Sequence, residues 1–335
     1  MIKIITILII ALESLNASDY FSGDSKGITS GDFLNLDINP RAIAMGSAQS
    51  AVIDDASAIY SNPAGLMEIP RFSIMLSRTQ YVEDINYHFI SYAQRLSYDS
   101  VIAISAFMNE IGTIEHTDIN QSIIGKFSPK DTVITLGYSR GITEFSDRET
   151  DVSMGIAYKY INSRIYHNAK ATAFDLGIRA YKFAYIPYKL SFLMQNLGSG
   201  LRYDEESVPI TLKFKIGGAI YPFPNLLLAT DLVLPKNDSL YINLGGELTL
   251  KTSENTSFLI RGGLNTQKSR NDVGGFSFGF GLNLKFLSID YSFAQMKDLG
   301  NTHNISISFD FPIKQPVFDR KEKSIYTHIP KAKAE

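Results

Sequence analysis

The fold is decided by one stretch of sequence, FSFGFGLNLKF at residues 276–286. Every even position in it is large and apolar, and every odd position is small or polar. Because successive side chains of a β-strand point to opposite faces, this alternation predicts a strand with one apolar and one polar face. The same alternation recurs around residues 209–221, 240–251 and 303–312.

Strand-like segments of this kind fill the chain from about residue 71 to residue 312. An even number of strands of about ten residues each is typical of barrels that span bacterial outer membranes. We count fourteen segments. The predicted strands are 71–80, 85–95, 100–109, 131–139, 151–161, 171–182, 188–197, 209–221, 225–234, 240–251, 256–265, 274–284, 286–295 and 303–312.

The two faces of these predicted strands differ in charge. A soluble antiparallel sheet with one wet face also alternates, but here the apolar face is nearly free of charge over strand after strand. Lipid tolerates neither charges nor open sheet edges, so we expect a transmembrane β-barrel over 71–312 with its polar face toward the lumen. The charged residues expected to face the lumen are Lys159, Asp175, Arg179, Lys213, Lys215, Glu247, Arg261 and Asp310.

The connections between predicted strands differ in length. Those after even-numbered strands are mostly short, as at 96–99, 222–224 and 252–255, and those after odd-numbered strands are mostly longer, as at 111–130, 198–208 and 266–273. Short periplasmic turns and longer outer loops are the rule for outer-membrane barrels. We therefore expect a multi-pass protein of the bacterial outer membrane with both termini in the periplasm.

Composition excludes several other classes. The 335 residues carry 32 Lys and Arg against 34 Asp and Glu, a net charge of −2, which gives no reason to expect nucleic-acid binding. Without any Cys, disulfides, thiolate metal sites and iron–sulfur clusters are excluded. A mean hydropathy of −0.02 is too polar for a bundle of membrane helices.

The first seventeen residues look like a signal peptide. Lys3 precedes an apolar run from Ile4 to Leu12, which is too short to span a bilayer, and a small residue, Ala17, stands at the expected cleavage site. We expect cleavage there and a mature protein outside the cytoplasm. Residues 18–70, between this peptide and the first strand, differ in composition from the rest.

Small residues dominate two motifs of that segment, at 40–51 and 54–66. Asp54 or Asp55 can cap a short helix that must end before Pro63, and Ala64-Gly65 makes a tight turn. The order of Arg41-Ala-Ile-Ala-Met-Gly, Asp54-Asp55 and Asn62-Pro63-Ala64-Gly65 resembles the N-terminal hatch of the FadL-like outer-membrane family. It is most similar to the PorV/PorQ and UPF0164 branch, and the similarity continues at 125–131, 174–177, 195–198 and 289–293.

The resemblance implies a fourteen-stranded barrel whose lumen is plugged by a hatch of short helices at 18–70. Members related to FadL carry fatty acids or other hydrophobic molecules, whereas PorV and PorQ are accessories of type IX protein secretion. The large outer loops of FadL-like transporters have only modest counterparts here. The expected function is passage or binding of a hydrophobic or amphipathic molecule, such as a fatty acid, by a barrel in contact with outer-membrane lipid. The alternative is a secretion accessory that binds secretion-system proteins.

No catalytic or metal site is expected. Residues 275–279 match the G-x-S-x-G motif, but that motif needs a strand-to-helix turn, and here it lies within a predicted strand. The histidines are scattered, without the spacing of metal ligands, at His88, His116, His167, His303 and His328. We therefore expect a protein without enzymatic activity, cofactor or metal.

Three features leave alternatives open. Asp54 and Asp55 could bind a cation, although helix capping and contacts between hatch and wall are favoured. The lumen charges could recognise a ligand carboxylate, or form a salt-bridged network that holds the hatch. The tail at 313–335, with a net charge of +3, could be solvated chain or a docking segment for a periplasmic partner.

Overall fold

The chain is described here from a computed structural model that covers residues 26–82, 85–142, 150–271 and 274–311. The predicted signal peptide at 1–17, the tail at 313–335 and His328 lie outside the described residues. Among the residues that are described, no helix is long and apolar enough to cross a membrane.

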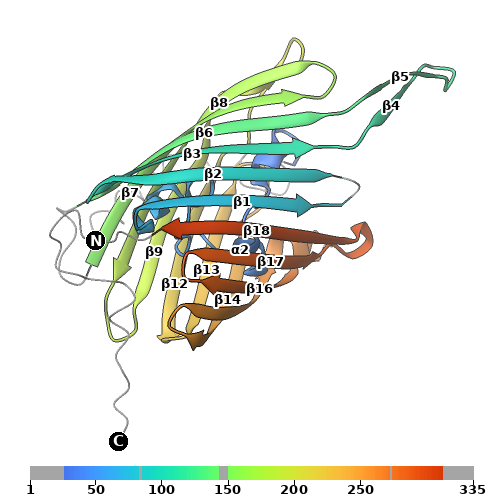
Figure 1. Ribbon diagram of the computed structural model, residues 1–335. Coiled ribbons are helices and arrows are strands. Elements are labelled where there is room, and N and C mark those ends of the chain that lie inside the picture. The colour runs from blue at the N-terminus through green and yellow to red at the C-terminus, as the bar shows by residue number, and fades with distance from the viewer. Residues whose placement is uncertain (1–25, 83–84, 143–149, 272–273, 312–335) are drawn as a thin grey trace, which may run out of the picture.

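Fourteen antiparallel strands form a closed barrel, as predicted (Figure 1). Each strand pairs with its neighbours in the sheet, and β18 pairs with β1 to close the ring. The strands are β1 (Phe72–Gln80), β2 (Asn86–Ser97), β3 (Ser100–Glu110), β6 (Lys130–Gly141), β7 (Thr150–Arg164), β8 (Asn168–Lys182), β9 (Tyr188–Gly198), β12 (Lys213–Phe223), β13 (Leu226–Pro235), β14 (Tyr241–Ser253), β15 (Thr256–Asn265), β16 (Phe276–Leu284), β17 (Leu287–Gln295) and β18 (Asn301–Phe311).

The alternation in the sequence becomes an inward and an outward face. In β18, Asn304, Ser306 and Ser308 are buried toward the lumen, while Ile305 and Ile307 are exposed on the outside. The other strands follow the same pattern, and the exposed outward side chains are mostly large and apolar.

Two additions lie at the strand ends. The predicted loop 111–130 contains a hairpin of β4 (Ile114–Thr117) and β5 (Ile123–Phe127), which extends beyond the barrel (Figure 1). The predicted strand at 209–221 begins only at Lys213, because the chain before it folds inward after the short pair β10 (Leu201–Arg202) and β11 (Ser207–Val208). Leu201 and Ile210 are consequently buried.

We call the two ends of the barrel the turn end and the loop end. The turn end holds the tight connections at 98–99, 224–225, 254–255 and 285–286. The loop end holds β4–β5, the connection 199–212, the helix α4 (Thr266–Arg270) and the short helix η5 (Lys297–Leu299).

Four short helices form the described part of the hatch inside the barrel: η2 (Asp32–Asn35), α2 (Pro40–Ala44), α3 (Ala58–Ser61) and η3 (Pro63–Glu68). Asn39 caps α2, with Pro40 at its first position, and Asn62 caps η3. The expected capping of α3 by an aspartate is wrong in position, since its N-cap residue is Ser57. The Asp55 carboxylate nevertheless accepts a hydrogen bond of 2.8 Å from the Ser57 backbone N–H.

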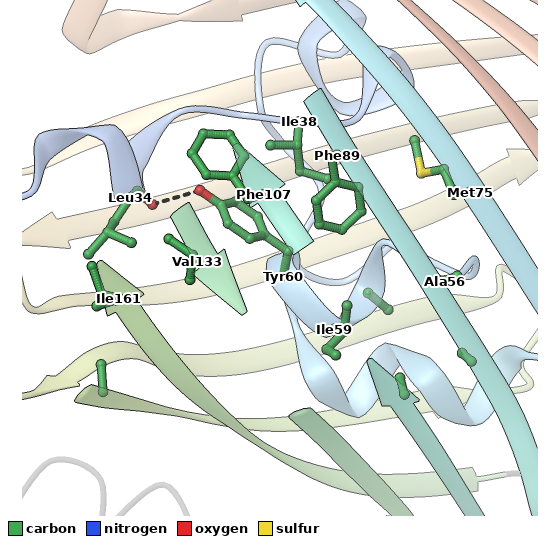
Figure 2. Close-up of a cluster of buried hydrophobic side chains, with 14 of the residues drawn as sticks. Leu34, Ile38, Ala56, Ile59, Tyr60, Met75, Phe89, Phe107, Val133 and Ile161 are labelled. Carbon is green, nitrogen blue, oxygen red and sulfur yellow. Dashed lines mark hydrogen bonds between the residues drawn. The ribbon is translucent and has the colours of Figure 1, made fainter. Parts of the chain in front are cut away.

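The hatch shares a hydrophobic core with the wall around Tyr60 (Figure 2). Its ring lies 5.8 Å from that of Phe89 and 5.9 Å from that of Phe107. The Tyr60 hydroxyl donates to the backbone oxygens of Leu34 and Leu36. A buried Tyr needs such a partner, so these bonds fix the hatch segment before α2 against the segment that contains α3.

Candidate functional site: the plugged lumen

The helix α2 is tied to the wall by a chain of alternating charges. Arg41 donates two hydrogen bonds to the Glu247 carboxylate, at 2.7 and 3.0 Å, and a third to Asp54 at 2.7 Å. Arg261 donates to the same Glu247 at 2.7 Å and to Asp290 at 2.5 Å. We call these five residues the α2 ion network; each guanidinium lies between two carboxylates, so both positive charges are compensated. The sequence predicted Arg261 and Glu247 on the lumen face; in the structure Glu247 contacts the hatch through Arg41, and Arg261 links Glu247 to Asp290 of the wall.

Glycines let the hatch backbone approach the wall near the end of α2. A Cβ added at Gly263 would lie 2.0 Å from the backbone nitrogen of Gly46, and one at Gly245 would lie 2.5 Å from the backbone oxygen of Met45. Real Cβ contacts are never this short, so no larger residue fits without moving the hatch. Gly46 itself has a φ of +62°, which also favours glycine.

The Asn62-Pro63-Ala64-Gly65 motif packs closely against glycines of the opposite wall, in β7 and β8. Cβ atoms added at Gly155 and Gly177 would lie 2.3 Å from Pro63 and 2.1 Å from the Asn62 side-chain oxygen. The Asn62 amide donates to the Ser50 backbone oxygen at 2.7 Å, and Asn62 is fully buried. The small residues of this motif therefore allow close docking on β7 and β8.

A second charged group holds the end of η3. Arg179 donates to the Glu68 carboxylate at 2.5 Å and to the Ile53 backbone oxygen at 2.8 Å, and the Lys189 nitrogen lies 3.8 Å from Glu68. Burial raises the pKa of Glu68, but the positive charges of Lys189 and Arg179 lower it by more, so the pKa lies below its usual value. Glu68 is therefore ionised and paired at neutral pH.

The first part of the described hatch, residues 26–37, is held differently. Ser30 donates its backbone N–H to Pro209 and its hydroxyl to Val208, both at 2.8 Å. Thr29 accepts hydrogen bonds from Thr211 and Asn237, at 3.1 and 2.7 Å. These contacts are neutral, and Cβ atoms added at its glycines would approach no atom closer than 3.4 Å.

Three lysines face the lumen on β7 and β12, and only one is paired. Lys159 lies 2.7 Å from Asp175 and donates to Asn196 at 2.8 Å. Lys213 and Lys215 are 6% and 5% exposed, and neither nitrogen has a hydrogen bond or ion pair with any described residue. Every other buried Lys or Arg within the described ranges contacts a carboxylate.

The remaining candidates from the sequence lie apart from the ion networks or bond to the hatch backbone. Asp310 lies on the lumen face opposite Ser73 but outside the ion networks. Ser277, in the G-x-S-x-G match, lies within β16 and donates to the Ala44 backbone oxygen. No described cluster of three His, Asp or Glu could hold a metal ion.

Two residues that contact the hatch, Asp231 and Arg95, were not among the lumen residues predicted from the sequence. Asp231 accepts bonds from the Ser50 backbone N–H and hydroxyl, at 3.0 and 2.7 Å. Arg95 donates to backbone oxygens of Met67 and Ile69 at the end of the hatch. A detectable signal existed for Asp231, because a lone carboxylate interrupts the apolar run 226–234 on its inward face.

No protein-family model and no curated protein matches the chain. Several solved structures are similar to the chain in fold. The toluene transporter TbuX of Ralstonia pickettii is 12% identical, with a TM-score of 0.54 over 82% of this chain and 98% of its own. The toluene transporter TodX of Pseudomonas putida is 10% identical, with a TM-score of 0.52 over 82% and 96%. The monoaromatic hydrocarbon channel CymD is 11% identical, with a TM-score of 0.50 over 83% and 98%.

These similarities establish the fold. The FadL-type barrel expected from the sequence is confirmed, while membership of the PorV/PorQ and UPF0164 branch stays a prediction. The alternative of a secretion accessory gains no support from these structures. The chain is thus similar in fold to barrels described as toluene transporters and as a monoaromatic hydrocarbon channel.

Proposed function

We propose that this chain is a non-enzymatic barrel of the bacterial outer membrane that binds a hydrophobic or amphipathic molecule in its lumen and passes it when the hatch moves. The proposal is supported by the fold, which is shared with proteins described as toluene transporters and a monoaromatic hydrocarbon channel. The apolar outward face is suited to contact with outer-membrane lipid.

The main support comes from the side chains of Lys213 and Lys215. Two buried lysines without an ion pair to a described residue are costly to charge, and an acidic group on a bound molecule would stabilise both. The arginines of the α2 ion network already have carboxylate partners, which favours a structural role for them. Of the predicted lumen charges, the lysine pair is therefore the best candidate for contacting a ligand such as a fatty acid.

The part of the hatch expected to move is 26–37. Thr211, two residues before Lys213, donates to Thr29 and to Asp32 at 3.1 and 3.2 Å. The bond to Thr29 is neutral, and the bond to Asp32 ends on an exposed carboxylate that water can also solvate. Such bonds contribute about 0.5–3 kcal/mol each, so their exchange for water is easier than breaking buried ion pairs. Displacement of 26–37 would open access to the lysine pair while 38–70 stays docked.

Native mass spectrometry tests the proposal on protein gently extracted from its own membrane. We expect a small apolar or amphipathic adduct on a single barrel, and its loss when Lys213→Met and Lys215→Met are combined. The control is Lys251→Met, which removes an exposed lysine beside the turn that joins β14 and β15.

Two results would overturn the proposal. An adduct that survives the double substitution would remove the lysine pair from the site. A stoichiometric protein partner without any small-molecule adduct would instead favour the secretion accessory.

A further inference from the structure

The wall of the barrel has a cavity on its outward side, away from the lumen. Its volume is about 500 Å³, and it is lined by Lys130, Thr132, Asn162, Arg164 and Asn168. The residues between them in the strands, Asp131, Ser163 and Ala169, are buried toward the lumen. The cavity therefore opens on the face that would contact the membrane, at the loop end of β6, β7 and β8.

Strand register brings positive charges together around this cavity. In one row Lys130 lies opposite Arg164, which lies opposite Asn168; in the next, Thr132 lies opposite Asn162, which lies opposite Lys170. The five lining residues include no carboxylate. The two rows contain three cations, Lys130, Arg164 and Lys170. Glu110, whose carboxylate lies 2.6 Å from the Lys130 nitrogen, offsets one of them, so two positive charges remain in excess.

Two polar groups at the cavity lack partners among the described residues. The Arg164 guanidinium is exposed and forms no hydrogen bond or ion pair there. The Asn162 side-chain oxygen is buried and has no hydrogen-bond donor. The cavity thus offers a charged donor suited to a phosphate and an acceptor suited to a hydroxyl.

Below these rows, toward the turn end, the same three strands are apolar on the outside. The next two rows contain Ile134 and Tyr160, then Leu136, Tyr158 and Phe174, all of them exposed. The rings of Tyr158 and Phe174 lie 5.3 Å apart. A molecule with its charged group in the cavity would lay an apolar chain along this surface.

Among the outward residues of the strands at the loop end, cations are concentrated on this wall. On the far wall, the outward residues nearest the loop end are Ile242 in β14, Leu264 in β15 and Phe276 in β16. Arg78 in β1 is an outward cation at the same end, but it does not line the cavity. A general belt of basic residues around the barrel does not account for the cluster on β6–β8.

We propose that this cavity binds the head group of an anionic membrane lipid, one that carries a phosphate and a free hydroxyl, with its acyl chains along Tyr160, Tyr158 and Phe174. The inference rests on the proposed membrane location but not on any transported ligand. Basic pockets at the level of the head groups are suited to anionic lipids, because phosphate accepts hydrogen bonds from Arg at little cost in an interface.

The test uses the full chain in nanodiscs of equimolar phosphatidylglycerol and phosphatidylcholine. Lipids that remain bound are counted by native mass spectrometry after release from the disc. We expect retention of phosphatidylglycerol over phosphatidylcholine, reduced about tenfold when Arg164→Gln and Lys170→Gln are combined, which corresponds to losing one charged hydrogen bond. The matched control is Arg78→Gln, which removes an outward cation at the same end and should leave retention unchanged.

Heat-modifiable electrophoretic migration of each variant shows that the barrel has folded and inserted, so failure to insert is separated from failure to bind lipid. Equal retention by the double variant and the unmodified chain would overturn the proposal, as would an equal loss in Arg78→Gln. Displacement of the lipid by inorganic phosphate alone would also overturn it, because the cavity would then be a site for a soluble anion.

Discussion

The two parts of the hatch, 26–37 and 38–70, occupy one lumen but are held by different forces. The second part is fixed by buried ion pairs at Arg41 and Glu68 and by backbone contacts with glycines of the wall. The first part is held mainly by hydrogen bonds to the connection 199–212, to Asn237 and to the Tyr60 hydroxyl, and its ion pair between Lys26 and Asp238 involves an exposed lysine.

Under the proposed function, this difference assigns anchoring to 38–70 and movement to 26–37. Breaking a buried ion pair leaves an uncompensated charge, and shifting a backbone away from a glycine contact opens a gap in the wall packing. Hydroxyl and amide bonds near an open end can be replaced by water at small cost. A plug built in this way can admit a molecule without leaving the barrel.

The largest effect is expected from cross-linking 26–37, the part of the hatch that is proposed to move. Because the chain contains no Cys, Ser30→Cys with Ile210→Cys introduces one disulfide, at partners of a β-bridge. We expect this disulfide to abolish ligand uptake by proteoliposomes, and reduction to restore it.

The matched cross-link fixes the second part of the hatch instead. The hydroxyls of Ser50 and Ser191 lie 2.8 Å apart, so the substitutions Ser50→Cys and Ser191→Cys place a disulfide between the second part of the hatch and β9. Uptake should be unaffected. If both disulfides block uptake, the distinction between the two parts is wrong.

Removing the centre of the α2 ion network should have the largest effect on stability. Arg261→Ala leaves Glu247 and Asp290 without that partner, at an expected cost of about 3–5 kcal/mol in the free energy of unfolding. Urea unfolding followed by electrophoretic migration measures it. Arg140→Ala, at an exposed pair with Asp99, should cost about 1 kcal/mol or less. Lost uptake with an equally stable barrel would assign Arg261 to the ligand instead.

A glycine substitution tests the backbone contact in isolation from charge. Gly263→Ala places a Cβ against the Gly46 backbone and should destabilise the folded barrel by about 1–3 kcal/mol. Its neighbour Gly262 faces outward, where a Cβ would come no closer than 4.0 Å to Phe278, so Gly262→Ala should be nearly neutral. Urea unfolding measures the stability of both variants. Equal stabilities would show that the hatch backbone can move away from a Cβ at residue 263 at little cost.

The smallest effect concerns the pH dependence of the hatch. Burial raises the pKa of the Asp55 carboxyl above its ordinary value of about 4, although the hydrogen bond from Ser57 partly offsets it. In the unfolded chain Asp55 has its ordinary pKa, and in the folded chain its pKa is higher. Between these two values the folded chain binds more protons than the unfolded chain, so the free energy of unfolding falls as pH rises through this range. We expect Asp55→Asn to flatten that profile in urea unfolding measured at several pH values. A profile unchanged by the substitution would contradict this assignment.

Much of the fold could be predicted because a barrel wall imposes one rule on every strand. The alternation at 276–286 predicted strands at 274–284 and 286–295, and β16 and β17 occupy 276–284 and 287–295. The rule fails where burial has another cause. Ile210 continues the alternation of β12, yet it packs inside the lumen and lies beside Ser30.

Local pattern also missed the hairpin β4–β5, whose residues are almost all exposed and therefore show no two-faced alternation. For the lumen, the inward positions of Arg261 and Lys213 followed from the alternation of the strands, but the ion pairs of Arg261 and the lack of one at Lys213 did not. Pairing of Glu247 with Arg41 joins a strand to the hatch across the lumen, and no sequence spacing encodes such a distance. The lack of an ion pair at Lys213 and Lys215 became visible only once the carboxylates of the described residues had been placed.

The pairing of β1 with β18 has a consequence for assembly. Phe72 of the first strand stacks on Phe311 of the last, with ring centroids 4.3 Å apart, so the ring closes between the two ends of the barrel sequence. Contacts between such distant parts of a chain form slowly. Until β18 is in place, β1 and β17 are open edges that can pair with other chains. A chain that ends before residue 301 would therefore aggregate rather than form a smaller barrel.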